Sequence, residues 1–495
     1  MKTINMKKIF YLLTLALISV GCSDFVDVND NPNDPAISTP SLTLPVAQQS
    51  FVALNARDMT YLGNYLAVNW ATPSNWSANT IFSRYNFTTT SYAAIFENSY
   101  ASIFKNLTYV ENFEDPSGAI DYSNYKAISQ IIKGFQYQLL VDLYGDIPYT
   151  EANKRGENTT PVYDDAETVY KSVIDNLTDV ADLIQNRPEN AENPGSQDII
   201  FRGDMNQWLQ FANTIKLRML VRLSNTGQDA YIKTQVDLIN ANGAGYITDD
   251  VVANPGYSVD ADKQNPFWDY FRKPSTGAEQ DRGDYTVATA YTINYLKDSN
   301  DPRLERLYAE AAKGGYKGAV QSTALPGEGF TSNDLSKVGP GLLVEAKQDA
   351  FIMTLEEALL IQAEAVVRGY ITGVAKDMYE SAIEASFERL GVPDAEAEAE
   401  AYYTQPVKNL SWDASPDKIE AIITQKWIAL NGTSSIESWI DLTRTGYPAG
   451  LPIPEESQGK RPMRLLYPAS EVARNSNNVP EQNADAVFNN PPFWK

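Results

Sequence analysis

Apolar residues recur at helical spacing in six long segments of the chain. In residues 122–144 they lie three or four positions apart, at Ile128, Ile131, Phe135 and Leu139. This spacing places them on one face of a helix with 3.6 residues per turn. The same pattern predicts helices over 164–186, 204–224, 354–368, 376–390 and 416–430.

Turn-forming residues separate these segments. Gly369 and Gly373 divide 354–368 from 376–390 into a helical pair, and Asp204 has the side chain of an N-cap. We therefore predict a mostly α protein of stacked helical pairs of the tetratricopeptide type, although the chain shows no clean 34-residue repeat.

Three long stretches, rich in Gly, Pro, Asn, Ser and aromatic residues, are predicted to be irregular. Loops of such length in a compact protein are usually functional. Ligand contacts are therefore expected in the stretches 72–91, 242–282 and 319–341.

The N-terminus has the pattern of a lipoprotein signal peptide. Three lysines precede an apolar run over 9–20, and Gly21-Cys22 follows. The run of twelve residues is shorter than the roughly twenty that a spanning helix needs. We predict a signal peptide over 1–21 and lipid attachment at Cys22. The alternative is an ordinary signal peptide followed by an incidental cysteine.

Residues 22–45 are rich in Asn, Asp and Pro, so we expect a tether that ends in a turn, followed by one ligand-binding body over 46–495. Asp27, Asn29 and Asn31 are spaced like calcium ligands. The glycine at the sixth position and the glutamate at the twelfth position of a calcium loop are missing, however.

Composition narrows the possible chemistry. The net charge is −23, and removal of three lysines with the signal peptide makes it −26. Such a field repels nucleic acid and anionic lipid, so the lipid anchor is the expected membrane contact. Cys22 is the only cysteine, which excludes an internal disulfide. The chain has no histidine, which excludes Ser-His-Asp catalysis and His-ligated metals. We expect no cofactor and no metal.

Seven short segments, in order along the chain, resemble the SusD/RagB family of Bacteroidetes nutrient-binding lipoproteins. The first is YGDIPYTEA within 143–152, which is similar to the family signature YGD-[IV]-PY-[ST]-EA. The other six are NPNDP at 31–35, WLQFANTIKLRMLVRLS at 208–224, NDPRL at 300–304, the helix 353–364, RTGYP at 444–448 and RLLYP at 464–468.

The resemblance covers the chain from Cys22 to Lys495. It implies tetratricopeptide-type helical pairs with an irregular, loop-rich region packed on them. It also implies an outer-membrane lipoprotein that binds oligosaccharide, in some cases peptide, without catalysis and delivers it to a SusC-like TonB-dependent transporter. Cys22-Ser-Asp resembles the family's signal for export to the cell surface, although Phe25 stands where a second acid is common.

We interpret several residues of these signatures as structural. Gly145 supplies a backbone angle that other residues resist, and Pro148 stops the preceding helix. Asp146 is expected to accept hydrogen bonds in a turn. Arg444 and Arg464 are expected to pair with buried carboxylates.

Sugar sites combine flat aromatic rings with polar side chains that bind hydroxyl groups. The segment 69–79 (NWATPSNWSAN) has this composition, and Pro73 breaks the helical pattern before it. We predict ligand contact by Trp76 on a loop. Trp70 is near a helix end, where a core position is slightly favoured over ligand contact. The other candidates from this region are Asn75, Asn79 and Tyr85.

A second candidate loop is 273–285. Arg282 is the best ligand candidate there, and Asp284 could contact ligand or cap a helix that runs toward Leu296. Tyr285 completes this group. From a third loop, beginning at residue 314, we select only Tyr316.

Two other functions are possible. Glycoside hydrolysis needs two facing carboxylates, and Glu356 and Glu357 are adjacent on a predicted helix and do not face each other. A tetratricopeptide-like scaffold that binds proteins would not need tryptophans on loops.

Overall fold

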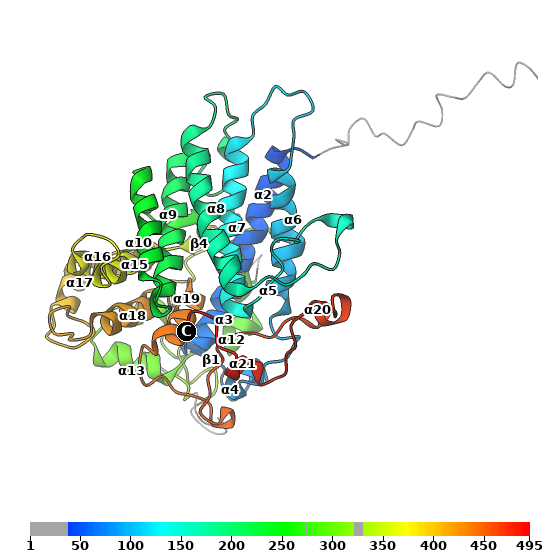
Figure 1. Ribbon diagram of the computed structural model, residues 1–495. Coiled ribbons are helices and arrows are strands. Elements are labelled where there is room, and N and C mark those ends of the chain that lie inside the picture. Colours follow the sequence, from blue (N-terminus) through cyan, green and yellow to red (C-terminus); the bar gives the residue numbers. More distant parts are fainter. Residues whose placement is uncertain (1–37, 274–275, 321–329) are drawn as a thin grey trace, which may run out of the picture.

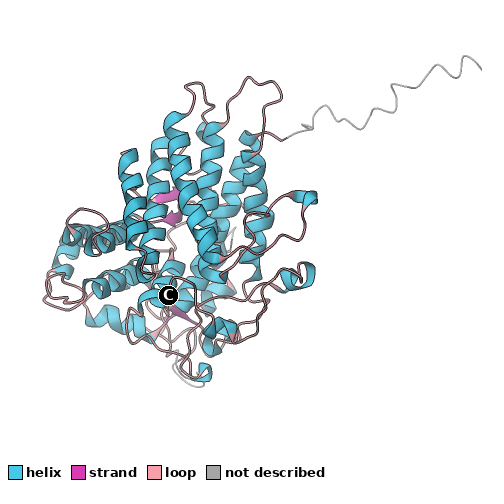
Figure 2. Cartoon of the chain, in the orientation of Figure 1, coloured by secondary structure: helices cyan, strands magenta, loops and turns pink. Residues whose placement is uncertain are grey.

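The computed structural model describes residues 38–273, 276–320 and 330–495. Long helices stand side by side on one side of the molecule, and a loop-rich region lies beneath them (Figures 1 and 2). The helices of the first half are α2 Pro40–Ala53, α3 Thr60–Leu66, α5 Ala93–Asn98, α6 Lys105–Glu111, α7 Ser123–Tyr144, α8 Ala166–Asn186, α9 Met205–Arg222 and α10 Asp229–Asn242. Single π-helical turns, η1 Leu54–Met59 and η2 Ser99–Phe104, lead into α3 and α6.

The predicted long helices of this half are confirmed as α7, α8 and α9. Asp204 is the N-cap of α9, since its carboxylate accepts hydrogen bonds from the backbone N–H groups of Asn206 and Gln207. Asp165 caps α8 in the same way, through the N–H of Thr168. The caps satisfy backbone donors that have no partner inside the helix, and so fix where each helix begins.

The predicted end of the tether at residue 45 is wrong, because α2 already begins at Pro40. Proline is tolerated at the first helical position, where its missing N–H would be unpaired anyway. Pro45 lies inside the helix and costs one backbone hydrogen bond, while Leu44, Ala47 and Phe51 are fully buried. Burial of this apolar face outweighs the proline signal. Cys22 and the calcium-like residues Asp27, Asn29 and Asn31 lie outside the described residues.

Four helices of the second half, within residues 355–429, form a smaller group at the left of Figure 1. Here α15 packs against both α16 and α18 around a separate apolar core that includes Leu360, Tyr379 and Phe387. The predicted pair 354–368 and 376–390 is confirmed. The four helices are α15 Leu355–Val367, α16 Ala375–Leu390, α17 Ala395–Tyr403 and α18 Lys418–Ala429, and α19 Ser435–Thr445 follows them.

Gly145 and Asp146 of the YGDIP segment are structural residues, as predicted, although Asp146 bonds the start of α8 and not its own turn. Gly145 ends α7 with a φ of 80°, a left-handed value that glycine adopts freely. Asp146 accepts a hydrogen bond from the N–H of Ala166, the first residue of α8, at 2.9 Å.

One of the two arginine predictions is confirmed and the other is wrong. Arg444 pairs with buried Glu364 at 2.6 and 2.8 Å and with Asp441 at 3.0 Å. Arg464 instead donates to the carbonyl oxygens of Tyr144 and Leu465. Tyr144 is the last residue of α7, where helical carbonyls lack partners and attract a cation.

The loop-rich region holds two short antiparallel sheets. Strand β1 Trp70–Ala71 pairs with β3 Val287–Ala288, and β2 Val251–Ala253 pairs with β4 Ala350–Met353. Its short helices are α4 Thr80–Arg84, α11 Pro266–Phe271, α12 Asp281–Tyr285, α13 Ala290–Asp298, α14 Leu304–Leu307, α20 Ala469–Arg474 and α21 Ala486–Asn489. Isolated 3-10 turns are η3 Arg155–Glu157, η4 Gly195–Gln197, η5 Leu223–Asn225 and η6 Glu455–Ser457. In their described residues, the stretches predicted to be irregular are therefore loops interrupted by elements of three to six residues.

Within the described ranges, no helix combines the length and the apolar character needed to cross a bilayer. The same residues contain no group of three or more acidic side chains arranged to share a metal ion.

Candidate ligand-binding site

Pairing of β1 with β3 brings two of the predicted loops together. Trp70 lies opposite Ala288 and Ala71 opposite Val287, so the chain after residue 71 runs beside the chain before residue 287. Trp76 lies in a turn closed by a hydrogen bond from its own N–H to the carbonyl of Pro73. The predicted loop position of Trp76 is confirmed, and its side chain is half-buried.

The Trp76 indole is held by both loops. Its Nε1 donates to Oδ2 of Asp284 at 2.6 Å. Its ring meets that of Tyr285 edge to face, with centroids 5.4 Å apart and planes at 64°. The two predicted groups thus form a single site, and a ring held at its polar edge can leave part of its face free for a ligand.

Asp284 is the acceptor at the centre of this arrangement. It accepts hydrogen bonds from Nζ of Lys337 at 2.8 Å and Oγ of Ser332 at 3.1 Å, in addition to the indole. Burial pushes the pKa of the Asp284 carboxyl upward, but the hydrogen bonds from Lys337, Trp76 and Ser332 outweigh it and leave the pKa below its usual value. The carboxylate therefore positions Trp76 and has little capacity left for a ligand.

The alternative role of Asp284 as a cap of the next helix is wrong. It lies inside the short helix α12, and the helix that runs toward Leu296, α13, is capped by the hydroxyl of Thr289.

Asn75 and Lys337 join a third loop to the other two. Oδ1 of Asn75 accepts from the N–H of Ser332 at 2.9 Å, and its Nδ2 donates to Oγ of the same serine at 3.2 Å. Lys337 contacts Glu279 at 2.6 Å as well as Asp284. We call Trp76, Asp284, Ser332 and Lys337 the loop clamp, because their contacts hold three loops in one geometry.

Arg282 extends the site along an aromatic surface. Its guanidinium carbon lies 3.5 Å from the ring centroid of Tyr270, which Arg57 approaches at 5.6 Å. In the part of the chain that the structure describes, Arg282 makes no ion pair or hydrogen bond, so its N–H groups are available. Tyr270 was missed in the sequence because it lies in a run of apolar and aromatic residues, PFWDYF, that is typical of core.

Two predicted contact residues are core residues instead. Trp70 is 0% exposed and lies among the rings of Tyr61, Tyr65 and Phe271. Tyr85 is 2% exposed. A ligand cannot reach either side chain, because each ring is turned inward against the main core.

Asn79 and Tyr316 are partly exposed, with different surroundings. The Nδ2 of Asn79 donates to the hydroxyls of Tyr61 at 2.7 Å and Tyr65 at 3.0 Å, so Asn79 links the loop to α3. Tyr316 packs on the main core, and its carbonyl accepts from Nζ of Lys297 of α13 at 2.7 Å. These contacts place Tyr316 beside α13 and not in the loop clamp.

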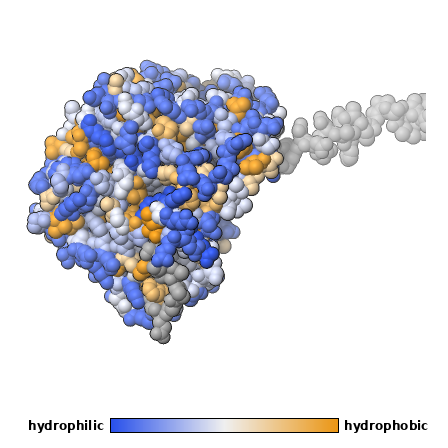
Figure 3. Space-filling model, turned by 60° about the horizontal axis from the view of Figure 1, so that its bottom comes forward, coloured by the Kyte–Doolittle hydropathy of each residue, from blue (hydrophilic) through white to orange (hydrophobic). Residues whose placement is uncertain are grey.

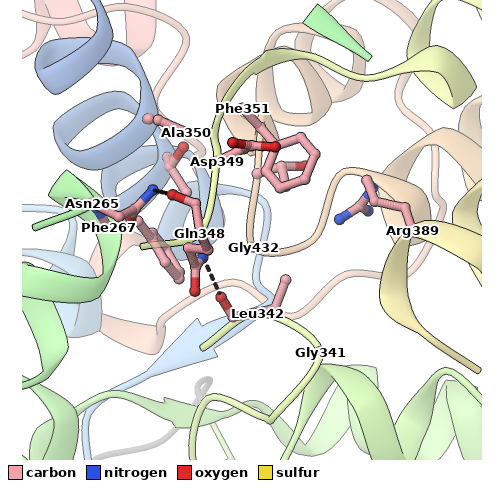
Figure 4. A pocket seen from close by; sticks show the side chains of 13 residues that line it. Asn265, Phe267, Gly341, Leu342, Gln348, Asp349, Ala350, Phe351, Arg389 and Gly432 are labelled. Atoms are coloured by element: carbon pink, nitrogen blue, oxygen red, sulfur yellow. Dashed lines mark hydrogen bonds between the residues drawn. The ribbon is translucent and has the colours of Figure 1, made fainter. Parts of the chain in front are cut away.

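A small pocket, with a cavity volume of about 20 Å³, lies elsewhere, between the helices and the loops (Figure 4). Arg389 on its wall is held by Glu356 at 2.6 Å and by the carbonyl of Ala429 at 2.8 Å. The side-chain amide of Gln348 donates to Leu342 O at 2.9 Å. None of the predicted contact residues lines this pocket. Figure 3 turns the loop-rich side forward and shows polar and apolar atoms interspersed there.

Comparison with solved structures supports the fold. A chitin-binding protein superposes with a TM-score of 0.71 at 25% identity, over 89% of this chain and 95% of its own. A SusD homologue from Bacteroides fragilis gives a TM-score of 0.74 at 22% identity, over 92% and 99%. A chitin-binding SusD homologue from Flavobacterium johnsoniae gives 0.72 at 23% identity, over 88% and 94%. A comparison with curated proteins gave no match.

A family model described as "Starch-binding associating with outer membrane" matches residues 32–468. The match spans most of the chain, and the helical architecture agrees with the solved SusD homologues. The chain belongs to the SusD-like family.

Proposed function

We propose that this chain is a lipid-anchored outer-membrane protein that binds oligosaccharide at the Trp76 site and passes it to a SusC-like TonB-dependent transporter. One observation carries the binding proposal: a half-buried loop tryptophan is fixed through its indole N–H and lies beside Tyr285. A pre-oriented ring loses little entropy when a sugar stacks on it.

The polar part of the site suits a neutral sugar. Arg282 is stacked on Tyr270 and offers free N–H donors to hydroxyl or amide oxygens. The carboxylates nearest Trp76, those of Asp284 and Glu279, are already paired with two cations, Lys337 and Arg272. Since one relative of similar fold is a chitin-binding protein at 25% identity, we propose chitin-type oligosaccharides as the first ligands to test.

We also propose that the chain is not a hydrolase. The adjacent acids Glu356 and Glu357 are both 0% exposed, and they pair with Arg389 at 2.6 Å and Arg218 at 3.0 Å. Buried, paired carboxylates of this kind stabilise the interior and cannot reach a polysaccharide. Release of reducing sugar by the pure protein would contradict this part of the proposal.

The test of the binding site is native gel electrophoresis in the presence of soluble chitin derivatives, with protein that begins at residue 23. The unaltered protein should be retarded, and Trp76→Ala should remove most of the retardation because the stacking ring is lost. Trp412→Ala is the matched control. Trp412 is also half-buried, but it packs on Tyr379 of the second core, with ring centroids 5.3 Å apart.

Equal retardation of the Trp76→Ala and unaltered proteins would refute the site. Binding of peptides without any glycan binding would favour the peptide alternative.

The transporter partner needs its own test. Pull-down through the intact, membrane-extracted protein should recover a large β-barrel protein in stoichiometric amount. Recovery of this protein alone, under conditions that preserve membrane complexes, would contradict the delivery role and leave binding intact.

A further inference from the structure

Exposed apolar residues lie at the end of the bundle where the described chain begins. Leu42 and Val46, one helical turn apart on α2, are 54% and 56% exposed, and Ile120 is 43% exposed. They point away from the α2 face that packs into the core through Leu44, Ala47 and other residues. Nothing in the described fold covers these three side chains.

Partly buried aromatic rings lie on the neighbouring helix α6 and on the loop that follows it. Helix α6 packs against α2, and the hydroxyl of Tyr109 on α6 donates to the carbonyl of Ser38 at 2.5 Å. From there the ring of Phe113 follows at 6.0 Å from Tyr109, and Tyr122 at 5.4 Å from Phe113. We call Leu42, Val46, Tyr109, Phe113, Ile120 and Tyr122 the anchor-side patch.

Some of the charges around the anchor-side patch are paired with charges of opposite sign, and others are not. Lys133 pairs with Glu111 at 2.7 Å, and Lys126 lies 3.6 Å from Glu114. The carboxylate of Asp115 accepts hydrogen bonds from the N–H groups of Ala119 and Ile120 within its own loop. Burial, Asp115 and Glu192 raise the pKa of the Tyr122 hydroxyl, so negative charge remains beside the patch, and a zwitterionic lipid surface suits it better than an anionic one.

The position of the patch relative to the chain's start limits what can cover it. Figure 1 shows α6 beside α2, the helix at which the described chain begins, and Figure 3 shows apolar surface beside the start of the described chain. Ser38 is 16 residues beyond Cys22. A chain of that length spans at most about 55 Å. A lipid on Cys22 would keep this end of the body at high effective concentration near the bilayer.

We infer that the anchor-side patch is a second membrane contact, which rests on the lipid surface beside the anchor. This inference depends on the proposed acylation of Cys22. Aliphatic side chains beside aromatic rings are suited to the boundary between headgroups and acyl chains. The contact would orient the body, because it presses one end of the bundle to the bilayer and leaves the loop clamp away from it.

The experiment uses the single-cysteine chain. With Cys22 acylated, an introduced cysteine is the only free thiol and takes an environment-sensitive fluorophore. Val46→Cys is compared with Val374→Cys, which is a matched control because Val374 is 57% exposed and precedes α16 at the other side of the molecule. Both acylated full-length proteins are placed in phosphatidylcholine vesicles that contain lipids with quencher-bearing acyl chains.

The emission of the fluorophore at position 46 should shift to the blue and be quenched by the lipids, and that at position 374 should not. Flotation with the vesicles reports the anchor separately. A protein that floats but shows equal quenching at both positions, or none at 46, overturns the inference and leaves the anchor intact. Failure of the protein to float with the vesicles would contradict both the lipid anchor and the membrane contact of the patch.

A second variant protects the test from an effect of the label at position 46. With the label at Ile120→Cys, the double substitution Leu42→Gln and Val46→Gln should abolish quenching at unchanged melting temperature. A blue shift at position 46 in Cys22→Ala protein without vesicles would show that the chain's own N-terminal segment covers the patch, and would overturn the inference.

Discussion

At the residue scale, Trp70 and Trp76 show how little composition says about exposure. They lie six positions apart in one segment, NWATPSNW. Trp70 belongs to a strand whose partner, β3, holds it against Tyr61 and Phe271, whereas Trp76 follows a turn at Pro73 and faces another loop. The difference arises from strand pairing with residues more than 200 positions away.

This contrast gives a stability prediction. Trp70→Ala should lower the free energy of unfolding by about 3–5 kcal/mol, because it leaves a large cavity in a fully buried site. Trp76→Ala should cost about 1 kcal/mol, since the ring is half-buried and loses one hydrogen bond. Urea denaturation followed by circular dichroism measures both. Similar losses for the two variants would mean that Trp76 is also core.

Lys337 should set the pH dependence of the loop clamp. Burial lowers the pKa of its ammonium, but hydrogen bonds to Asp284 and Glu279 outweigh burial and raise it. The pKa of Asp284 is lowered in the folded protein, so its contribution is present above the ordinary value near 3.8 and is lost as pH falls through the lower folded value. Lys337→Met removes the main cause of the lowered Asp284 pKa. The stabilising contribution of Asp284 should then be lost at a higher pH than in the unaltered protein.

The measurement is the pH profile of the Trp76 fluorescence, obtained as the difference from a Trp76→Phe protein. Lys313→Met is the control, because Lys313 pairs with Asp334 at 2.6 Å, is 68% exposed and forms no ion pair with Asp284 or Glu279 in the described structure. An unchanged fluorescence profile in Lys337→Met would show that Lys337 does not influence the Asp284–Trp76 contact.

At the element scale, the packing of α3 on α19 depends on one glycine. A Cβ atom at Gly63 would lie 2.0 Å from the backbone nitrogen of Ile436 and 2.4 Å from the carbonyl carbon of Ser435. Backbone atoms cannot move aside as a side chain can. Close approach of these two helices therefore requires a residue without a side chain.

Gly63→Ala should destabilise the protein by about 3 kcal/mol or more through overpacking. Gly134→Ala in α7 is the matched control. Its Cβ would meet only the flexible Leu177 side chain, at 3.1 Å. The gain in helix propensity of about 1 kcal/mol should offset that contact. Thermal unfolding compares the two, and equal melting temperatures would show that α3 and α19 can separate without cost.

At the scale of the whole molecule, buried charges connect helices from both halves of the chain. Arg222 of α9 contacts Glu437 of α19 and lies 3.9 Å from Asp142 of α7. Asp142 also accepts from the indole of Trp494, next to the C-terminus, at 2.7 Å. Removal of one partner would leave a buried charge uncompensated, so the network favours one arrangement of the helices.

Asp142 should make stability depend on pH. Burial raises the pKa of its carboxyl from 3.8 to about 6, although Arg222 opposes the rise. A raised pKa means that the folded state holds a proton which the unfolded chain has already lost, so stability falls as pH rises from about 4 to 6. The loss attributable to Asp142 is about 3 kcal/mol.

The side chain in Asp142→Asn cannot titrate, so the variant should lack this pH-dependent loss of stability. Any destabilisation caused by the substitution itself should be the same at every pH. The difference in unfolding free energy between Asp142→Asn and the unaltered protein should therefore shift in favour of the variant between pH 4 and pH 7. Denaturant titrations at several pH values measure it, and a difference that stays constant would show that Asp142 remains ionised throughout.

The sequence by itself determined the elements whose signals are local. The apolar period set α7, α8, α9, α15 and α16, and the cap at Asp204 and the glycine at 145 needed only their neighbours. The absence of histidine excluded Ser-His-Asp catalysis and His-ligated metals, and short sequence signatures indicated the family. Both inferences depend only on which residues are present and in what order.

Only the tertiary structure decided which side chains form the candidate site. Trp76 and Asp284 are 208 positions apart, and Lys337 lies on a third loop. Tyr270 looked like core, Trp70 and Tyr85 proved to be core, and Arg464 binds the carbonyl end of α7 in place of a carboxylate. The physical reason is that exposure and pairing depend on which distant segments the chain path brings together, and no local pattern records that path.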